Sequence, residues 1–322
     1  MITSLILHQV ANFLGLDKFT VQNIAKNAPY RYKRYAIPKR NGCGKRIILH
    51  PSQETKAIQY AILHILLNKL AAHDRSFAYR KGLSSPLRAN AEQHCSSPFT
   101  IRIDFKDFFP SLKPNDLYTV LEAGDKPLLS PSDKIFLERS LFFPYKKLGL
   151  GLPIGAPTSP SISNAVLYDL DIQFNNASKS INPKSVYTRY ADDINFSSDT
   201  PGDCHKFLNA IDSILSKSTT PTLTINRAKT IYLSRKSRRQ ITGLTITPDG
   251  KVSLGRDRKR YIKKLAFEYI SSRLPQDQRN FLKGLLAFTL DNDPMFYHSL
   301  IIKYGDKINT LLKEQMQPSS DL

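Results

Sequence analysis

This sequence contains few acidic residues, few cysteines and no long apolar run, and each shortage excludes a class of protein. Three widely spaced cysteines without a CxxC pair do not predict a disulfide framework or a zinc site, and they fit a reducing cytoplasm. The longest uncharged stretch, residues 148–168, contains three glycines and three prolines, so we predict no membrane-spanning helix. No basic flank precedes the first apolar residues, and we therefore expect no signal peptide.

The shortage of acidic residues leaves a strongly basic chain, with 47 Lys and Arg against 27 Asp and Glu and a formal net charge of +20. Hydrophobic residues make up 41% of the 322 residues, which is enough for a core in about two domains and excludes a largely disordered chain. A cationic surplus on a folded chain indicates a polyanionic partner. Because membrane insertion is excluded, nucleic acid is the expected partner.

The cationic surplus is concentrated between Arg227 and Lys264, where thirteen basic residues accompany two acidic ones. On a helix beginning near Arg256, these side chains would surround an apolar stripe that includes Ile262 and Leu265, and they can line the groove of a duplex. A solvated helix face is the alternative, but so dense a charge would repel itself without a polyanion.

Apolar periodicity predicts an α+β chain with a helical C-terminal module. The first thirty residues, residues 58–70 and residues 203–216 follow helical spacing, and the chain from about Arg256 onward is also helical. Strands are predicted at residues 99–104, 186–190, 194–196, 223–225 and 231–233. An Asn41-Gly42 turn between two short apolar segments predicts a β-hairpin.

Two acidic features interrupt strands that are otherwise apolar. Asp104 closes the first of them, and Asp192-Asp193 lie at the tip of a hairpin that Tyr190 enters. Buried carboxylates are costly unless cations neutralise them, so three on adjacent strands indicate a site for two divalent ions about 3.5–4 Å apart. Oxygen ligands favour Mg²⁺. An ordinary Asp-Asp turn is the alternative for the hairpin tip.

Five motifs in a fixed order carry a resemblance to a known family. Tyr190-Ala191-Asp192-Asp193 resembles the YxDD box of reverse transcriptases, and Asp104-Phe105-Lys106-Asp107-Phe108-Phe109 is similar to their first palm motif. Residues 152–160 resemble their nucleotide-pocket loop, residues 226–230 their lysine motif and residues 46–51 their fingers element. The likeness extends over about residues 30–310.

Two shorter strings narrow the resemblance to the retron reverse transcriptases of bacteria. Asn90-Ala91-Glu92-Gln93-His94 matches their NAxxH pattern, and Ile241-Thr242-Gly243 is similar to their VTG pattern, with Ile in place of Val. The length of the chain leads us to expect no RNase H, protease, integrase or endonuclease domain.

The resemblance implies a catalytic role for five residues. Asp104, Asp192 and Asp193 are expected to bind two Mg²⁺ ions, with the carbonyl of Phe105 completing one ligand shell. Lys229 is expected either to protonate the pyrophosphate leaving group as a general acid or only to neutralise it.

Four further residues are implied in dNTP binding. Arg46 would grip the triphosphate, Phe109 would exclude a 2′-hydroxyl as a steric gate, and Pro153 and Gly155 belong to the pocket loop. A core position is the alternative for Phe109. Ile154 occupies a position where many relatives have Gln, so we expect no polar side-chain contact with the nucleotide there and only contacts from the backbone and the shape of the pocket.

Two groups of RNA-binding residues are also implied. Asn90 and His94 are expected to contact structured RNA, with a helix cap and a satisfied polar contact as the alternative. The basic C-terminal helix is expected to hold a folded stem of the cognate RNA through its cations: Arg256, Arg258, Lys259, Arg260, Lys263 and Lys264.

The family implies a right-hand polymerase with N-terminal helices and fingers in residues 1–98, a palm in 99–245 (about 112–150 partly fingers) and a helical thumb in 246–322. The implied reaction is RNA-templated DNA synthesis, primed from a guanosine 2′-hydroxyl of the protein's own msr-msd type noncoding RNA. Its product is branched multicopy single-stranded DNA (msDNA), with a role in phage defence beside a separate effector protein. The alternatives are another group II intron-like or phage-exclusion reverse transcriptase, or a non-catalytic RNA-binding scaffold that restrains an effector.

Overall fold

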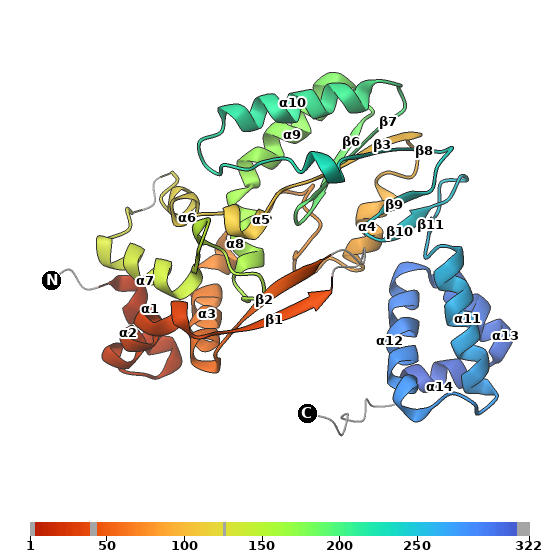
Figure 1. The fold of residues 1–322 in the computed structure, drawn as a ribbon, viewed down its shortest axis with the longest axis horizontal. Helices are drawn as coiled ribbons and strands as arrows, with labels where there is room; N and C mark the ends of the chain where they lie inside the picture. The colour runs from red at the N-terminus through yellow and green to blue at the C-terminus, as the bar shows by residue number, and fades with distance from the viewer. Residues whose placement is uncertain (1–3, 39–43, 125–126, 314–322) are drawn as a thin grey trace.

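The computed structural model describes residues 4–38, 44–124 and 127–313, and its helices and sheets form the predicted α+β fold (Figure 1). Four helices pack together near the N-terminus: α1 (Leu5–Leu14), α2 (Lys18–Asn27), α3 (Gln53–Ile65) and α7 (Pro131–Leu141). Ser4 caps α1 by accepting from the Leu7 amide at 3.0 Å, and its hydroxyl donates to Asp133 at 2.6 Å, which ties α1 to α7. No helix in these ranges is long and apolar enough to cross a membrane.

The predicted hairpin is confirmed by an antiparallel pair, β1 (Tyr32–Pro38) and β2 (Lys45–Pro51). Its predicted Asn41-Gly42 turn lies outside the described residues. Both strands are largely exposed apart from Leu49 and Pro51, and the hairpin extends away from the N-terminal helices (Figure 1). The 3-10 helix η1 (Ala28–Tyr30) leads into β1, and α4 (Pro86–Glu92) follows later in the chain.

A four-stranded antiparallel sheet lies at the centre, in the order β6-β7-β3-β8. Its strands are β3 (Phe99–Asp104), β6 (Val186–Tyr190), β7 (Asp193–Ser198) and β8 (Ile231–Ser234). The register pairs Asp104 with Asp193 across β3 and β7, and Tyr190 with Asp193 across the β6–β7 hairpin. Two helices, α9 (Tyr168–Ile181) and α10 (Asp203–Lys217), cover one face (Figure 1). The Phe196 and Phe207 rings stack beneath α10, with their centroids 4.2 Å apart.

The strand predicted at residues 223–225 is wrong. Only Ile225 forms a bridge there, opposite Phe105, because this segment lies beside the last residue of β3 and the residues that follow it. The amide of Lys106 donates to the Thr224 carbonyl at 2.8 Å, and the amide of Asn226 donates to the Asp104 carbonyl at 2.7 Å. The segment is therefore anchored at the end of the sheet that carries Asp104.

Short elements connect the hairpin to the sheet. The 3-10 helix η2 (Leu67–Lys69) follows α3, and the remaining connections after β3 are α5 (Phe108–Ser111), α6 (Pro114–Leu121), β4 (Phe143–Tyr145), β5 (Gly149–Gly151) and α8 (Ser159–Val166). Together with the N-terminal helices and the central sheet they share one hydrophobic core.

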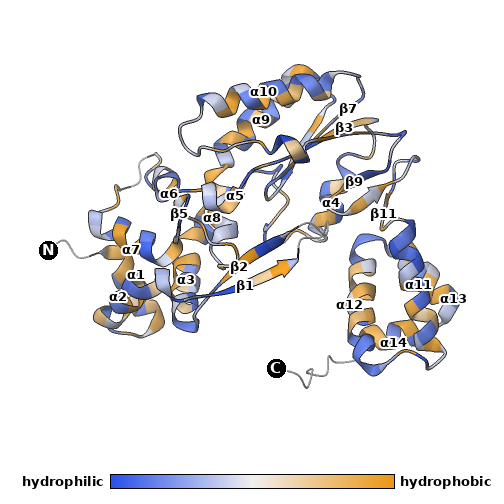
Figure 2. Cartoon of the chain, viewed as in Figure 1, coloured by the Kyte–Doolittle hydropathy of each residue, from blue (hydrophilic) through white to orange (hydrophobic). Residues whose placement is uncertain are grey.

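A second hydrophobic core contains Ala91 of α4 and buried residues from Ile241 to Leu311. It contains the predicted helices, which the structure confirms as α11 (Arg256–Ile270), α12 (Gln276–Asn292), α13 (Pro294–Tyr304) and α14 (Lys307–Lys313). Figure 2 shows apolar and polar residues recurring along each of them, as expected for helices that bury one face. A small sheet that the sequence did not predict precedes them: β9 (Arg239–Ile241), β10 (Leu244–Ile246) and β11 (Val252–Ser253).

Candidate active site

The three predicted aspartates converge at one end of the central sheet. Asp104 ends β3 and Asp193 begins β7, directly opposite each other in the strand register. Asp192 occupies the hairpin turn, and its carbonyl accepts from the Phe105 amide at 3.4 Å. Asp104 is only 7% exposed. Strand pairing therefore brings together three carboxylates that are separated by almost ninety residues of chain.

The three buried aspartates are costly to ionise together. Burial and the neighbouring Asp192 raise the pKa of Asp193 to about 6. Burial, followed by the nearby charge of Asp104, also raises the pKa of Asp192, while Arg46 and Lys229 act in the opposite direction. Buried carboxylates that repel one another need cations before they can all ionise.

Lys229 supplies one of these cations. Its ammonium donates to both oxygens of Asp104, at 2.9 and 3.1 Å, from the 3-10 helix η3 (Arg227–Lys229). Asn226 donates its side-chain amide to the same carboxylate at 3.2 Å. The sequence predicted Lys229 in this site but not Asn226, although Asn226 opens the same motif.

The carboxylates have the donor chemistry of a divalent metal site, since hard cations prefer carboxylate and carbonyl oxygens. Across the described ranges, however, no three His, Cys, Asp or Glu side chains are arranged to hold a metal ion together. The Lys229 ammonium lies on Asp104 instead. A metal ion at this carboxylate would therefore have to share or displace that contact.

A buried ion pair that the sequence did not reveal supports the aspartate turn. Arg189, which is fully buried in β6, donates to both oxygens of Asp171 in α9 at 2.7 and 2.6 Å. Its third bond, at 3.1 Å, goes to the carbonyl of Ala191, which adopts a left-handed conformation (φ 57°) just before Asp192. Tyr187 donates to Asp171 at 2.6 Å. The available signal was a charged residue in an otherwise buried strand.

The pocket loop, residues 152–160, is hydrogen-bonded to the hairpin and to α5. The amide of Leu49 in β2 donates to the Ile154 carbonyl at 2.7 Å, and the amide of Leu152 donates to the Phe109 carbonyl at 3.0 Å. Gly155 has a φ of 117°, and a Cβ at this position would lie 2.9 Å from the Leu49 carbonyl oxygen. Only glycine fits there. The Pro153 carbonyl accepts from the Ser159 hydroxyl at 2.8 Å, so Ser159 helps to hold the loop in place.

Two other predicted nucleotide-binding residues border the same site. Arg46 is exposed on β2, and its charge acts on Asp192. Phe109 is partly exposed and packs edge-to-face against Phe108 at 5.2 Å, whereas Phe108 is only 4% exposed. Of these two rings, Phe109 is therefore the one that can reach a bound nucleotide.

Asn90 and His94 are placed differently from the expectation of RNA contact. Both are fully buried, which contradicts direct contact with RNA. The two His94 ring nitrogens form 2.7 Å hydrogen bonds with Ser197 in β7 and Thr188 in β6. For His94 the alternative, a satisfied polar contact, is confirmed. Asn90 lies within α4, and its amide atoms have no hydrogen-bond partner in the described part of the chain.

The six cations predicted on α11 divide into two sets. Arg256, Arg260, Lys263 and Lys264 are exposed. Arg258 and Lys259 are partly buried, because Arg258 lies over the Phe288 ring and Lys259 pairs with Asp293 at 2.8 Å. Only the exposed set presents an open cationic face.

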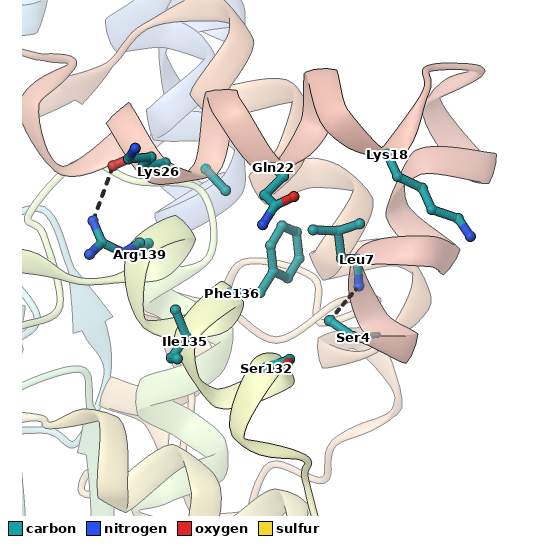
Figure 3. Close-up of a pocket in the computed structure, with 10 residues that line it drawn as sticks. Ser4, Leu7, Lys18, Gln22, Lys26, Ser132, Ile135, Phe136 and Arg139 are labelled. Atoms are coloured by element: carbon teal, nitrogen blue, oxygen red, sulfur yellow. Dashed lines mark hydrogen bonds between the residues drawn. The ribbon is translucent and has the colours of Figure 1, made fainter. Parts of the chain in front are cut away.

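A separate cavity of about 490 Å³ lies between α1, α2 and α7 (Figure 3). Leu7, Gln22 and Phe136 point toward it, and Arg139 at its rim donates to the Lys26 carbonyl at 3.3 Å. It contains none of the predicted site residues.

Comparison with known proteins gives a consistent result. The model of a family described as reverse transcriptase (RNA-dependent DNA polymerase) matches residues 37–246. The chain is 36% identical over 289 residues to the retron Ec83 reverse transcriptase of Escherichia coli, covering 88% of this chain and 90% of that protein. It is 33% identical over 290 residues to the retron Ec73 reverse transcriptase of the same species, covering 87% and 89%. Telomerase from Candida albicans, solved with a fragment of telomeric RNA, is similar with a TM-score of 0.45 at 15% identity, covering 92% of this chain and 57% of that one.

Proposed function

This chain belongs to the retron reverse transcriptases, RNA-directed DNA polymerases of the right-hand fold, and from that premise we propose that it copies part of its own noncoding RNA into DNA. The primer is a guanosine 2′-hydroxyl in that RNA, and the product is branched msDNA. The observation that carries the catalytic part is the convergence of Asp104, Asp192 and Asp193 at the end of the sheet, beside Lys229. The role of the product is phage defence together with a separate effector protein.

In this proposal the three aspartates and the Phe105 carbonyl hold two Mg²⁺ ions, which when bound stabilise charge on the attacking and leaving oxygens. Arg189 holds the Ala191 carbonyl and so keeps Asp192 and Asp193 aimed at the end of β3. Lys229 is 52% exposed, so its ammonium can turn from Asp104 to the pyrophosphate and either neutralise or protonate it.

The nucleotide-binding residues act from the opposite side of the site. Arg46 on β2 binds the triphosphate as a planar, bidentate donor. The Phe109 ring lies under the sugar and excludes a 2′-hydroxyl. Pro153 and Gly155 shape the pocket through the backbone, with Ile154 providing no polar side chain.

We also propose the three-part division of the chain. Residues 1–98 form the fingers with part of 112–150, residues 99–245 the palm and residues 246–322 the thumb. The exposed cations of α11 then face a stem of the cognate RNA. The two hydrophobic cores, one ending near Ile225 and one formed by Ala91 together with residues from Ile241 to Leu311, support a division of the chain between Ile225 and Ile241, slightly before residue 245.

The test is to purify the protein with its bound nucleic acid and to sequence both strands. We expect one RNA species joined to DNA through a 2′,5′ linkage that debranching enzyme cleaves. The Asp192→Asn variant should retain the RNA and lack the DNA. Recovery of unrelated RNAs without attached DNA, from a wild-type protein that extends a generic primer–template, would overturn self-priming while leaving polymerase activity intact.

A further inference from the structure

A basic cavity of about 670 Å³ lies between the small β9–β11 sheet and the start of α11. It contains none of the residues of the aspartate site, and it shares only Arg256 with the exposed cations of α11. Its lining includes one acidic residue, Asp257. Six cationic residues also line it: Arg235, Lys236, Arg238, Arg239, Arg256 and Lys259.

Most of these cations lack a carboxylate partner. Arg238 pairs with Asp257 at 3.2 Å, and Lys259 pairs with Asp293 at 2.8 Å. The other four form no ion pair with any described residue. Four cations around one cavity repel each other, and an anion between them would relieve that repulsion.

Arg239 is the strongest indication of a ligand. Its residue is only 1% exposed, and one terminal nitrogen donates to the Ser97 carbonyl. The other terminal nitrogen is buried and has no acceptor among the residues described, and neither has the buried hydroxyl of Thr245 in the same lining. Burial and the neighbouring Arg235 lower the pKa of Arg239. Buried donors without an acceptor are costly, so an acceptor is expected here.

The N-terminus of α11 opens onto the same cavity. Its N-cap is Gly255, with a φ of 82°, and no side chain caps the helix. A Cβ at Gly255 would lie 2.8 Å from the Thr245 hydroxyl and 3.2 Å from an Arg238 nitrogen, so the backbone approaches the lining closely. The start of a helix carries partial positive charge and amide donors, which favour an anion.

We propose that this cavity binds a phosphate group of the RNA backbone. A phosphate offers several charged acceptors at once, which suits two guanidiniums, a hydroxyl and a helix N-terminus together. Arg239 and Thr245 form the floor, and Arg235 and Lys236 form the rim. This inference rests on the proposed function, because it assumes bound RNA, and it adds a fixed backbone contact at the junction between the central sheet and α11.

The test uses the full-length protein and two probes. Inorganic phosphate, titrated at constant ionic strength against chloride, should raise the melting temperature of the wild type. Arg235→Gln/Lys236→Gln should weaken phosphate binding at least about tenfold, the equivalent of about 1.4 kcal/mol, and Thr245→Val should weaken it less. Lys184→Gln/Lys217→Gln removes the same charge from exposed positions elsewhere and should leave binding unchanged.

The second probe is the cognate RNA across a salt series. The double rim variant should reduce the slope of log K against log salt by about 0.7–0.9 for each lost contact. Phosphate binding without a change of slope would assign the cavity to free phosphates and overturn the RNA assignment. No phosphate effect in the wild type would overturn the site itself. Extension of a generic primer–template by the wild type tests the proposed function separately, so the two failures are distinguishable.

Discussion

The central sheet and α11 carry charge in opposite ways. At the sheet, Arg189 of β6 and Asp171 of the covering helix α9 are fully buried and form several hydrogen bonds, and Asp104 is held by Lys229. On α11, Arg260 and Lys263 are exposed and have no ion pair with a described residue. Buried charges act strongly over short distances and are little affected by salt, whereas exposed charges are screened. Charge in the sheet therefore determines geometry, and charge on α11 determines affinity for a polyanion.

Substitutions at the aspartate turn should have the largest effect, because they should abolish catalysis without weakening RNA binding. Asp192→Asn or Asp193→Asn should reduce DNA synthesis by about ten-thousandfold, equivalent to about 5.4 kcal/mol, because each removes a carboxylate that holds metal. RNA binding should change little. Primer extension and filter binding measure the two effects, and Asp169→Asn, an exposed change on α9, is the matched control. Wild-type synthesis by both variants would contradict the two-metal assignment.

The ion pair behind the turn should show the next largest effect. Arg189→Met leaves Asp171 buried without its partner, and we expect a loss of about 3–5 kcal/mol in the free energy of unfolding. Urea denaturation measures this loss. Arg189→Met/Asp171→Leu should recover much of the stability but not kcat, since nothing then holds the Ala191 carbonyl. Full recovery of kcat in the double variant would show that the ion pair stabilises the fold but does not position the aspartate turn.

His94 gives the buried region a pH-dependent stability. Burial, with help from Arg239 and Arg75, lowers the pKa of His94 to about 3. The unfolded chain binds this proton below about pH 6.5, so the free energy of unfolding falls as the pH falls, by about 1.6 kcal/mol between pH 6.5 and 5. The His94→Gln variant should lack this component. Equal slopes of unfolding free energy against pH in both proteins would contradict the buried neutral ring.

Phe108 is buried and Phe109 is partly exposed, so substitutions of these two neighbouring rings should affect different properties. Phe109→Val should reduce discrimination against rNTPs by about tenfold, which is about 1.4 kcal/mol. Phe108→Leu should mainly reduce stability, because Phe108 is buried. Single-nucleotide incorporation with dNTPs and rNTPs measures the ratio. Loss of discrimination against rNTPs in the Phe108 variant alone would identify Phe108, and not Phe109, as the steric gate.

The exposed face of α11 should show the smallest effect per residue. Replacing Arg260, Lys263 and Lys264 with Gln should change the free energy of unfolding by less than about 0.5 kcal/mol each. The salt slope of RNA binding should fall by up to about 0.7–0.9 per lost contact. Extension of a concentrated generic primer–template should survive better than priming from the cognate RNA. An unchanged slope would identify a solvated face.

The sequence predicted those parts of the site in which chemistry constrains residue type. Asp104, Asp192 and Asp193 were found because charge interrupts buried strands, and Lys229 because it lies in a recognisable motif. Arg189 and Asp171 were missed because their pairing depends on how α9 packs under the sheet, eighteen residues away in sequence. The short strands β9–β11 contain too few residues for a period to be visible. The NAxxH string did not reveal that Asn90 and His94 face inward.

The register of the β6–β7 hairpin limits how this region can vary in length. Tyr190 pairs with Asp193 across a turn of only two residues, and Asp193 in turn faces Asp104 on β3. One inserted residue would shift the strand by one position and move every following side chain to the opposite face of the sheet. Variation among relatives, and libraries built on this chain, should therefore substitute residues at this tip but never lengthen it. Insertions belong in exposed loops such as residues 199–202, where no strand register follows from the length.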